Sequence, residues 1–463
     1  MHGRGAAVRL AAVVLVSGVV AVSAATTAGA AVADELPQSQ GGATATIGGL
    51  KASGAAVIHE GDRDEHVSAG LFEMSVDNGG TLQTYGVDIY SPAQKDAKYQ
   101  ETPWSGTSLQ GNRDAGRIRW ILQNSYPQVN DLAALAAKAG ARGLSEQDAA
   151  AGTQVAIWRY SDDVTVDAVD PQAEKLADYL HRSARDLAEP AASLSLDPPA
   201  VSGHPGELLG PVTVRTNAGG VTVTPPADAT SGVKIVGRDG KEITSATDGG
   251  ELYFDVPEDA SGGSAALTVQ ASTTVPVGRA FAAETRSQTQ ILAGSSESTV
   301  SAAATANWAG AGAIPALSAE KNCAESGLDV SAVNEGDKVF TFELMGSEHT
   351  VEAGTSQTVT VPLQEGQPYD FTVEGPGSYQ KRFQGVLDCQ TQSAVGVGGG
   401  EEIQTLNEPS PATVGGASAT TADLADTGTS SVTPVIAGVA IGLVLIGGAA
   451  VLFVRKKKAP TQD

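Results

Sequence analysis

The chain has 463 residues and a formal net charge of −24 at pH 7, because its 53 acidic residues far outnumber its 29 basic ones. Such an acidic excess opposes contact with a phosphate backbone, so we expect no nucleic-acid partner. The six histidines form no H-E-x-x-H motif or Cys/His cluster, and no phosphate-cradling glycine motif opens a helix. The composition therefore predicts no metal site, no cofactor and no enzyme.

The N-terminus has the three parts of a secretory signal peptide. Two arginines precede an uncharged apolar run from Leu10 to Val22, and A-x-A-like cleavage sites end at Ala30 and Ala33. We assign residues 1–33 to this signal and leave the cleavage site open between the two motifs. The alternative is an N-terminal membrane anchor, for which the apolar run is short.

A first domain is predicted over residues 44–195, with both strand-like and helical patterns. Residues 84–89 are typical of a short strand. Residues 131–139 are rich in alanine and predict a helix that ends at Gly140 as a C-cap. The head of the chain is therefore expected to be mixed α/β.

Two further helices are predicted in the same domain. Ser145, with Asp148 three positions on, is a capping-box signature for a helix that ends near Tyr160. Pro171 suits the first position of a third helix, which we expect to run to about Leu187.

Residues 198–312 predict an antiparallel β-sandwich, because short runs of alternating apolar and polar residues fill this part of the chain. Residues 212–223 are typical of a hairpin that turns at 217–220, and Asp239-Gly240 is a second turn signal. Leu252, Phe254 and Val256 should face one side of a strand.

A second, immunoglobulin-like β-sandwich is predicted over residues 313–390, with apolar residues alternating along three runs. The chain's two cysteines, Cys323 and Cys389, bracket it. In an oxidising compartment such a pair favours a disulfide over a metal site. Residues 391–423 are rich in Gly, Ser, Thr, Ala and Pro and predict a disordered stalk.

The C-terminus carries a membrane-span signal. Residues 435–454 contain no charge, and at ~1.5 Å per residue they match a ~30 Å hydrocarbon core as one transmembrane helix. The basic tail, residues 455–463, begins Arg-Lys-Lys-Lys and should stay cytoplasmic. An ordinary single-span membrane protein is one interpretation of these two parts.

Just before the span lies a pentapeptide, residues 424–428, made of Leu424, Ala425, Asp426, Thr427 and Gly428. This order of pentapeptide, span and basic tail resembles sortase substrates with an LPxTG-like peptidoglycan anchor. Alanine at the second position resembles the LAxTG variant of class E sortases. The resemblance implies cleavage after Thr427 through an acyl-enzyme step and covalent attachment to peptidoglycan in a Gram-positive cell wall. Loss of both predicted ends would remove six basic residues and one acidic residue, leaving a net charge of −29.

The first domain resembles the thioester (TQXA) domains of Gram-positive surface proteins. The residues that carry the resemblance are Thr153-Gln154-Val155-Ala156, followed by Trp158, and the segment Tyr85-Gly86-Val87-Asp88-Ile89. In that family a cysteine on an early strand bonds to the glutamine of the TQXA motif, and the resulting thioester acylates amines on a host or matrix surface. Here Gly86 occupies the cysteine position, so the resemblance implies a degenerate site at Gly86 and Gln154.

The resemblance leaves alternative functions open. One is a non-covalent adhesin for an unidentified surface ligand, with Tyr85 and Trp158 in a ligand groove, although Trp158 is also a reasonable core residue. Another is a structural cell-wall or stalk protein with a degenerate head. Asp162-Asp163 has no accompanying nucleophile or base, so an enzyme is not favoured. Lys–Asn cross-links in the β-domains and the oligomeric state stay undetermined from the sequence.

Overall fold

The computed structural model describes residues 41–61, 63–226, 232–377 and 379–389. Over these residues the chain is multidomain and mostly β, with few helices. No helix within these ranges is long and apolar enough to cross a membrane. Five predicted segments lie outside the described residues: the signal peptide, stalk, sorting motif, membrane span and basic tail.

Among the described residues, four α-helices and one short 3-10 helix belong to the N-terminal part of the chain. They are α1 (Ala115–Gln123), α2 (Leu132–Ala139), α3 (Glu146–Ser161), α4 (Pro171–Ser183) and η1 (Trp104–Gly106). The strands of this part, together with two later ones, are β1 (Thr44–Glu60), β2 (Arg63–Val76), β3 (Thr81–Gly86), β4 (Lys98–Thr102), β5 (Val166–Ala168), β14 (Ala280–Ala283) and β15 (Gln290–Ser295).

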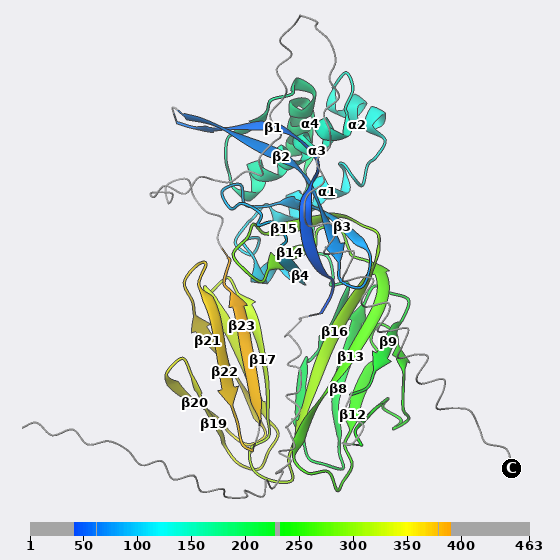
Figure 1. Ribbon diagram of the computed structural model, residues 1–463, viewed down its shortest axis with the longest axis vertical. Helices are drawn as coiled ribbons and strands as arrows, with labels where there is room; N and C mark the ends of the chain where they lie inside the picture. The colour runs from blue at the N-terminus through cyan, green and yellow to red at the C-terminus, as the bar shows by residue number, and fades with distance from the viewer. Residues whose placement is uncertain (1–40, 62, 227–231, 378, 390–463) are drawn as a thin grey trace, which may run out of the picture. The chain divides into compact units, whose positions relative to one another are not determined.

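These seven strands form one sheet that closes on itself. Its order is β2-β3-β15-β14-β4-β1-β5, and β1 also pairs with β2, so six of the strands complete a ring. Strands β14 and β15 come from residues 280–295, about ninety positions after the predicted end of the first domain. The predicted domain boundary at residue 195 did not anticipate that these two strands belong to the seven-stranded sheet, which we call the head sheet (Figure 1).

The head sheet has an apolar layer on each face. On one face it packs against α1, α3 and α4 through a cluster that includes Leu71, Tyr85 and Ile118. On the other face, residues such as Ile47 and Phe281 join a cluster that continues into the core of the following β-sandwich. The head is therefore covered by helices on one side only.

Local sequence signals set the ends of the helices. Asp131 caps α2 by accepting a hydrogen bond from the Ala134 amide, and Gly140 ends it with a left-handed φ of 67°. Ser145 and Asp148 form the predicted capping box of α3.

Helix α4 begins at Pro171 as predicted but ends at Ser183 rather than near Leu187. Residues 186 and 187 instead pass so close to Gly116 of α1 that a Cβ there would overlap them. The extended path of this segment is therefore fixed by packing against α1, and only glycine at position 116 permits it.

The next part is a sandwich of two sheets. One has the order β10-β12-β8-β6 and the other β11-β9-β13-β16-β7. Their strands are β6 (Leu194–Asp197), β7 (Ala200–Gly203), β8 (Leu208–Thr216), β9 (Val221–Thr224), β10 (Lys234–Val236), β11 (Ser245–Ala246), β12 (Glu251–Asp255), β13 (Gly263–Thr274) and β16 (Glu297–Trp308). Strand β7 runs parallel to β16, so this sandwich is not wholly antiparallel.

The predicted hairpin over residues 212–223 is wrong, because its two strands belong to different sheets. Strand β8 pairs with β6 and β12, whereas β9 pairs with β11 and β13. Both runs alternate apolar and polar residues because each faces the same core, and alternation alone does not show which strands pair. The turn at Asp239-Gly240 is present, with Gly240 at a φ of 71°.

The last described part contains short sheets around a separate apolar cluster. Its strands are β17 (Pro315–Asn322), β18 (Gly327–Asn334), β19 (Phe340–Leu344), β20 (Ser347–Val351), β21 (Thr355–Pro362), β22 (Pro368–Glu374) and β23 (Gln380–Val386). Phe340, Phe342 and Leu344 are buried on alternate positions of β19, as their spacing predicts.

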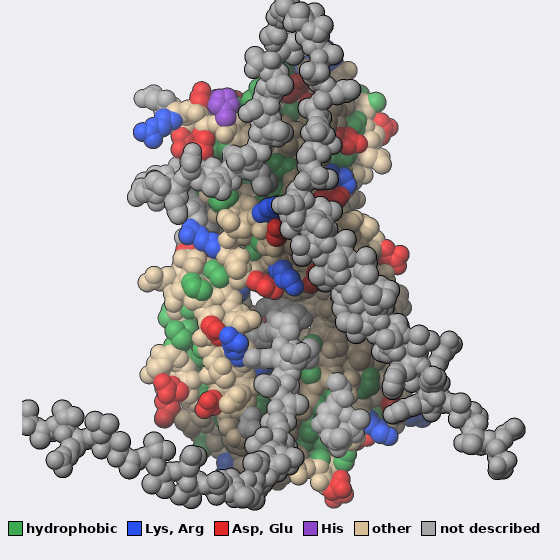
Figure 2. Space-filling view, viewed as in Figure 1, with side chains coloured by type: hydrophobic (Ala, Val, Ile, Leu, Met, Phe, Trp, Pro, Cys, Tyr) green, Lys and Arg blue, Asp and Glu red, His purple; other side chains and the backbone are tan. Residues whose placement is uncertain are grey.

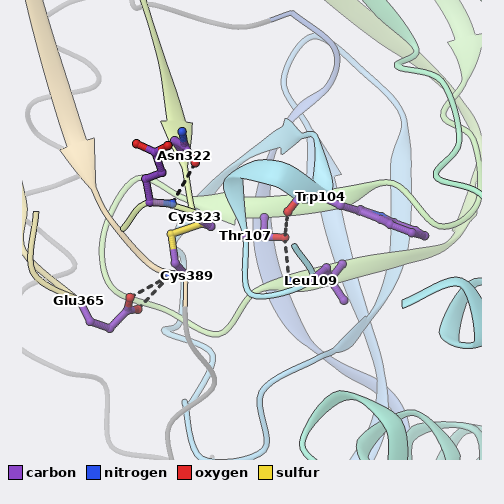
Figure 3. The surroundings of a disulfide bond; sticks show 8 residues. Trp104, Thr107, Leu109, Asn322, Cys323, Glu365 and Cys389 are labelled. Atoms are coloured by element: carbon purple, nitrogen blue, oxygen red, sulfur yellow. Dashed lines mark hydrogen bonds between the residues drawn. A yellow bond between two sulfur atoms is a disulfide. The ribbon is translucent and has the colours of Figure 1, made fainter. Parts of the chain in front are cut away.

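Cys323 and Cys389 form a disulfide across this last part. Figure 3 shows the Glu365 carboxylate pointing at Cys389, whose amide donates to its two oxygens at 2.9 and 3.1 Å. The Cys323 amide donates to the Ser105 carbonyl of η1 at 3.2 Å, so the disulfide lies close to the 3-10 helix of the head.

Candidate functional site

The TQXA-like residues lie in the middle of α3, where the helix is buried on all sides. Residues 153–156 are each at most 1% exposed. The Gln154 carboxamide points at the last residue of β3: its Nε2 donates to the Gly86 carbonyl at 2.7 Å, and its Oε1 accepts from the Gly86 amide at 3.0 Å. The structure therefore brings together the two residues that the sequence placed in one site.

Strand pairing explains why Gly86 is free to make this contact. Strand β2 pairs with β3 only as far as Thr84. On the opposite side Gly86 lies across from Gln290, while the hydrogen bond of the ladder runs from the Val87 amide to the Thr289 carbonyl at 3.1 Å. The N–H and C=O of Gly86 therefore have no partner on a neighbouring strand, and the Gln154 carboxamide makes the two hydrogen bonds that a peptide group of such a strand would make.

The space beside the Gly86 α-carbon is filled by a second glutamine. A Cβ built at Gly86 would overlap the carboxamide of Gln288. Gln288 is 6% exposed, and its Nε2 donates to the Asp88 carbonyl. A side chain at position 86 would therefore first meet Gln288, and Gly86 is required here by close approach.

The hydrogen bonds extend from Gln288 to a third buried glutamine. Gln290 Nε2 donates to Gln288 Oε1 at 3.1 Å, and Thr84 Oγ1 donates to Gln290 Oε1 at 2.9 Å. Both Gln290 and Thr84 are fully buried. No local signal marks Gln288 or Gln290 as part of this site, because Gln288 precedes β15, Gln290 is its first residue, and only the topology brings this strand into the head.

Tyr85 and Trp158, predicted to line a ligand groove, are both inside the protein. Tyr85 is fully buried, its hydroxyl donates to the Tyr126 carbonyl at 2.9 Å, and burial raises its pKa. Trp158 is 5% exposed, and its indole N–H has no partner among the described residues. Neither ring is available to a ligand in this conformation, because both belong to the buried apolar cluster that packs the sheet against the helices.

The adjacent acids after α3 differ in their surroundings. Asp162 accepts hydrogen bonds from the Ile89 amide at 3.2 Å and from Ser161 Oγ at 2.6 Å, whereas Asp163 is exposed. Burial raises the pKa of Asp162 well above its usual value, and the nearby charge of Asp88 adds to the effect. Asp162 thus holds the Val87–Ile89 segment against the end of α3, next to the glutamines.

The arrangement bears directly on thioester chemistry. A thioester needs a thiol to displace ammonia from the glutamine carboxamide. The chain's two cysteines are joined to each other, and no free cysteine exists among the described residues. The group nearest to the Gln154 carboxamide is the backbone of Gly86, which is no nucleophile.

Comparisons with known proteins agree with the position of this site. Residues 83–186 match the family model described as "Thioester domain", and residues 315–386 match that of "Bacterial phospholipase C, C-terminal domain". No curated protein matches the chain.

Two solved structures resemble the chain at low identity. One is the Bacillus anthracis TIE protein, with 17% identity, 75% of this chain and 64% of that chain covered, and a TM-score of 0.27. The other is the thioester domain of the Enterococcus faecium TIE86 protein, with 14% identity, 58% and 97% covered, and a TM-score of 0.28. The chain thus spans less than two thirds of the B. anthracis chain. It is over residues 83–186, which carry Gly86 and Gln154, that the chain is similar to thioester domains.

Proposed function

We propose that the chain is an exported surface protein whose thioester-like head attaches cells to host, matrix or neighbouring-cell surfaces without a working internal thioester. The match to the thioester-domain family supports the surface role. One observation supports the absence of a working thioester. Both polar groups of the Gln154 carboxamide are bound to Gly86, while Gln288 fills the space where a side chain at position 86 would lie.

Intact-mass analysis of the purified full chain tests whether the internal thioester is absent. The expected mass shows no loss of ammonia, and incubation with methylamine adds nothing. A Gly86→Cys variant should also stay unreacted, or react poorly, because Gln288 blocks the thiol. A Gly86→Cys/Gln288→Ala variant clears that space, and we expect it to lose one ammonia and then to take up methylamine with release of a free thiol. Gly86→Ala/Gln288→Ala is the matched control without sulfur. A wild-type chain that loses ammonia or binds methylamine would refute the proposal.

The adhesive role has its own test. Beads coated with the full chain should bind a surface saturably, and detergent or denaturant should release them because no covalent bond forms. Binding that survives denaturation, or no binding to host cells, matrix or neighbouring bacteria, would argue against a non-covalent adhesin.

Wall anchoring belongs to the same proposal and rests on the sequence. We propose that a class E-like sortase cleaves after Thr427 and joins the chain to peptidoglycan, and that the apolar segment 435–454 holds the precursor in the membrane until then. Mass spectrometry of wall fragments should find Thr427 amide-linked to a peptidoglycan amine. Recovery of the chain with residues 435–454 intact, from cells with an active sortase, would contradict it.

A second candidate is a structural cell-wall protein that uses the head as a spacer. The burial of Tyr85 and Trp158 favours it, because the expected groove is filled by the protein's own side chains. Under this alternative, cells that lack the protein would change in wall or surface organisation but adhere as well as cells that carry it.

A further inference from the structure

A pocket of about 510 Å³ lies away from the glutamines, where several elements meet. Its wall includes Glu101 of β4, the segment 189–192 between α4 and β6, Arg279 just before β14, and Glu320 of β17. A volume of this size is within the range of small-molecule sites. Three carboxylates and one guanidinium make the lining rich in charge.

Arg279 supplies the one guanidinium of the pocket wall, and its side chain is only 5% exposed. Its Nε donates to Glu101 Oε1 at 2.9 Å, and its Nη1 donates to Glu189 Oε1 at 2.7 Å and to the Pro190 carbonyl at 3.2 Å. Within the described part of the chain no group accepts from Nη2. This nitrogen is not among the buried atoms that lack a partner, so it is open to solvent, and an acceptor that enters the pocket can bind it.

Glu101 uses its whole carboxylate inside the protein. Besides Arg279, it accepts from the amides of Ala43 at 3.1 Å and Ser193 at 2.9 Å, and from the Ser193 hydroxyl. Its side chain is fully buried. Glu101 therefore balances the charge of Arg279 and holds its guanidinium in place, but it has no capacity left for a ligand.

The carboxylates of Glu189 and Glu320 can still accept hydrogen bonds from a ligand. Glu189 accepts from Arg279 and from the Trp104 amide through Oε1 alone, and its side chain is 33% exposed. Glu320 is exposed and makes no hydrogen bond or ion pair among the described residues. Desolvation raises the pKa of Glu320, and the charges of Asp197 and Asp329 raise it further. A cation beside Glu320 would relieve that repulsion.

We propose that this pocket binds a small aliphatic amino acid, with its carboxylate on Arg279 Nη2 and its ammonium group beside Glu320 and Glu189. A simple anion would reach Nη2 but would also face the two partly free carboxylates. A simple cation would satisfy the carboxylates but leave Nη2 without an acceptor. Only a zwitterion supplies an acceptor for Nη2 and a cation for the carboxylates at the same time. A charge-assisted hydrogen bond at each end makes it bind more tightly than a simple anion or a simple cation. Among the described residues no cluster suits a metal ion.

Calorimetric titration of the full chain with glycine, β-alanine, γ-aminobutyrate and ε-aminocaproate tests this site, because the series varies the distance between the two charges. Acetate and methylammonium supply each charge alone. We expect one member of the series to bind about tenfold more tightly than either single ion, because its second charge adds a charge-assisted hydrogen bond that neither ion can make alone. Glu320→Gln should weaken that binding by about the same factor and leave the fold intact, because the side chain is exposed. Glu348→Gln, which removes an exposed acid of β20 that does not line the pocket, is the matched control.

Three results would overturn the proposal. The first is that no member of the series binds. The second is that acetate or methylammonium binds as tightly as the best amino acid. The third is that Glu320→Gln binds that amino acid as well as Glu348→Gln does. None of these results depends on whether the head carries a thioester, so this test is independent of the adhesive role.

Discussion

Replacing Gln154 tests whether its carboxamide takes the place of a strand at the end of β3. Gln154→Ala leaves the N–H and C=O of Gly86 without the partners they have at 3.0 and 2.7 Å. An unsatisfied buried backbone group costs about 1–3 kcal/mol, so the two together predict a loss of about 2–6 kcal/mol in the free energy of unfolding. The site is fully enclosed, with Gln154 only 1% exposed, so solvent cannot replace the lost partner.

Gln154→Glu keeps the shape and makes the effect depend on pH. A protonated carboxyl can accept from the Gly86 amide and donate to its carbonyl, but a carboxylate would place negative charge against that carbonyl. The folded-state pKa of the new acid should therefore lie above its unfolded value of about 4.3. A raised folded-state pKa means that stability is retained below about pH 4 and lost as the pH rises. If the buried acid titrates near pH ~7, about 1.4 kcal/mol per pH unit gives a loss of roughly 4 kcal/mol by pH 8.

Denaturant unfolding at pH 4.5 and pH 8, followed by tryptophan fluorescence, measures both variants. Three of the four tryptophans lie in the head, at positions 104, 120 and 158, so the signal reports mainly on that part. Gln147→Glu adds the same charge to an exposed position of α3 and serves as the control. If Gln154→Glu loses no more stability at pH 8 than Gln147→Glu, or if Gln154→Ala unfolds at the wild-type midpoint, the carboxamide does not support β3.

Three further variants test other contacts. Gly86→Ala should lower the thermal unfolding temperature, because its methyl group meets Gln288 and costs about 1–3 kcal/mol of stability. Adding Gln288→Ala should recover part of that loss. An unchanged unfolding temperature for Gly86→Ala would contradict the close approach. Arg279→Met should cost about 3–5 kcal/mol in denaturant unfolding, because it leaves the fully buried Glu101 carboxylate without its cation. A variant that unfolds at the wild-type midpoint would count against this reason. Ser145→Ala should lower the stability of α3 by about 1 kcal/mol, because it removes the capping box. Faster amide hydrogen exchange in the first turn of the helix would measure this loss, and an unchanged exchange rate would contradict the role of the cap.

The parts of the fold that the sequence could predict are those fixed by neighbouring residues. The C-cap of α2 at Gly140, the capping box of α3 and the start of α4 at Pro171 each depend on a few adjacent positions. Helix α1 was not predicted, although Ile118, Ile121 and Leu122 have the spacing of a buried helix face.

Features that depend on distant parts of the chain were missed. The hairpin over 212–223 failed because the alternation of β8 and β9 reports a shared core rather than a shared sheet. The contact between Gly86 and Gln154 could be expected only through a resemblance to a family. Gln288 lies about two hundred positions from Gly86, and a polar residue before a short strand carries no local sign that it will be buried in another domain's sheet.

The closed ring of the head makes the order of synthesis matter. Strands β14 and β15 occupy the gap between β3 and β4, so the ring stays open until residue 295 has been synthesised. The chain also needs β13 and β16 on either side of this insertion to bring both strands into place. The N-terminal part of a nascent molecule must therefore wait, with a sheet edge exposed, for its later neighbour to emerge. Fragments that stop near residue 195 should therefore be prone to aggregate, because they keep this sheet edge unpaired.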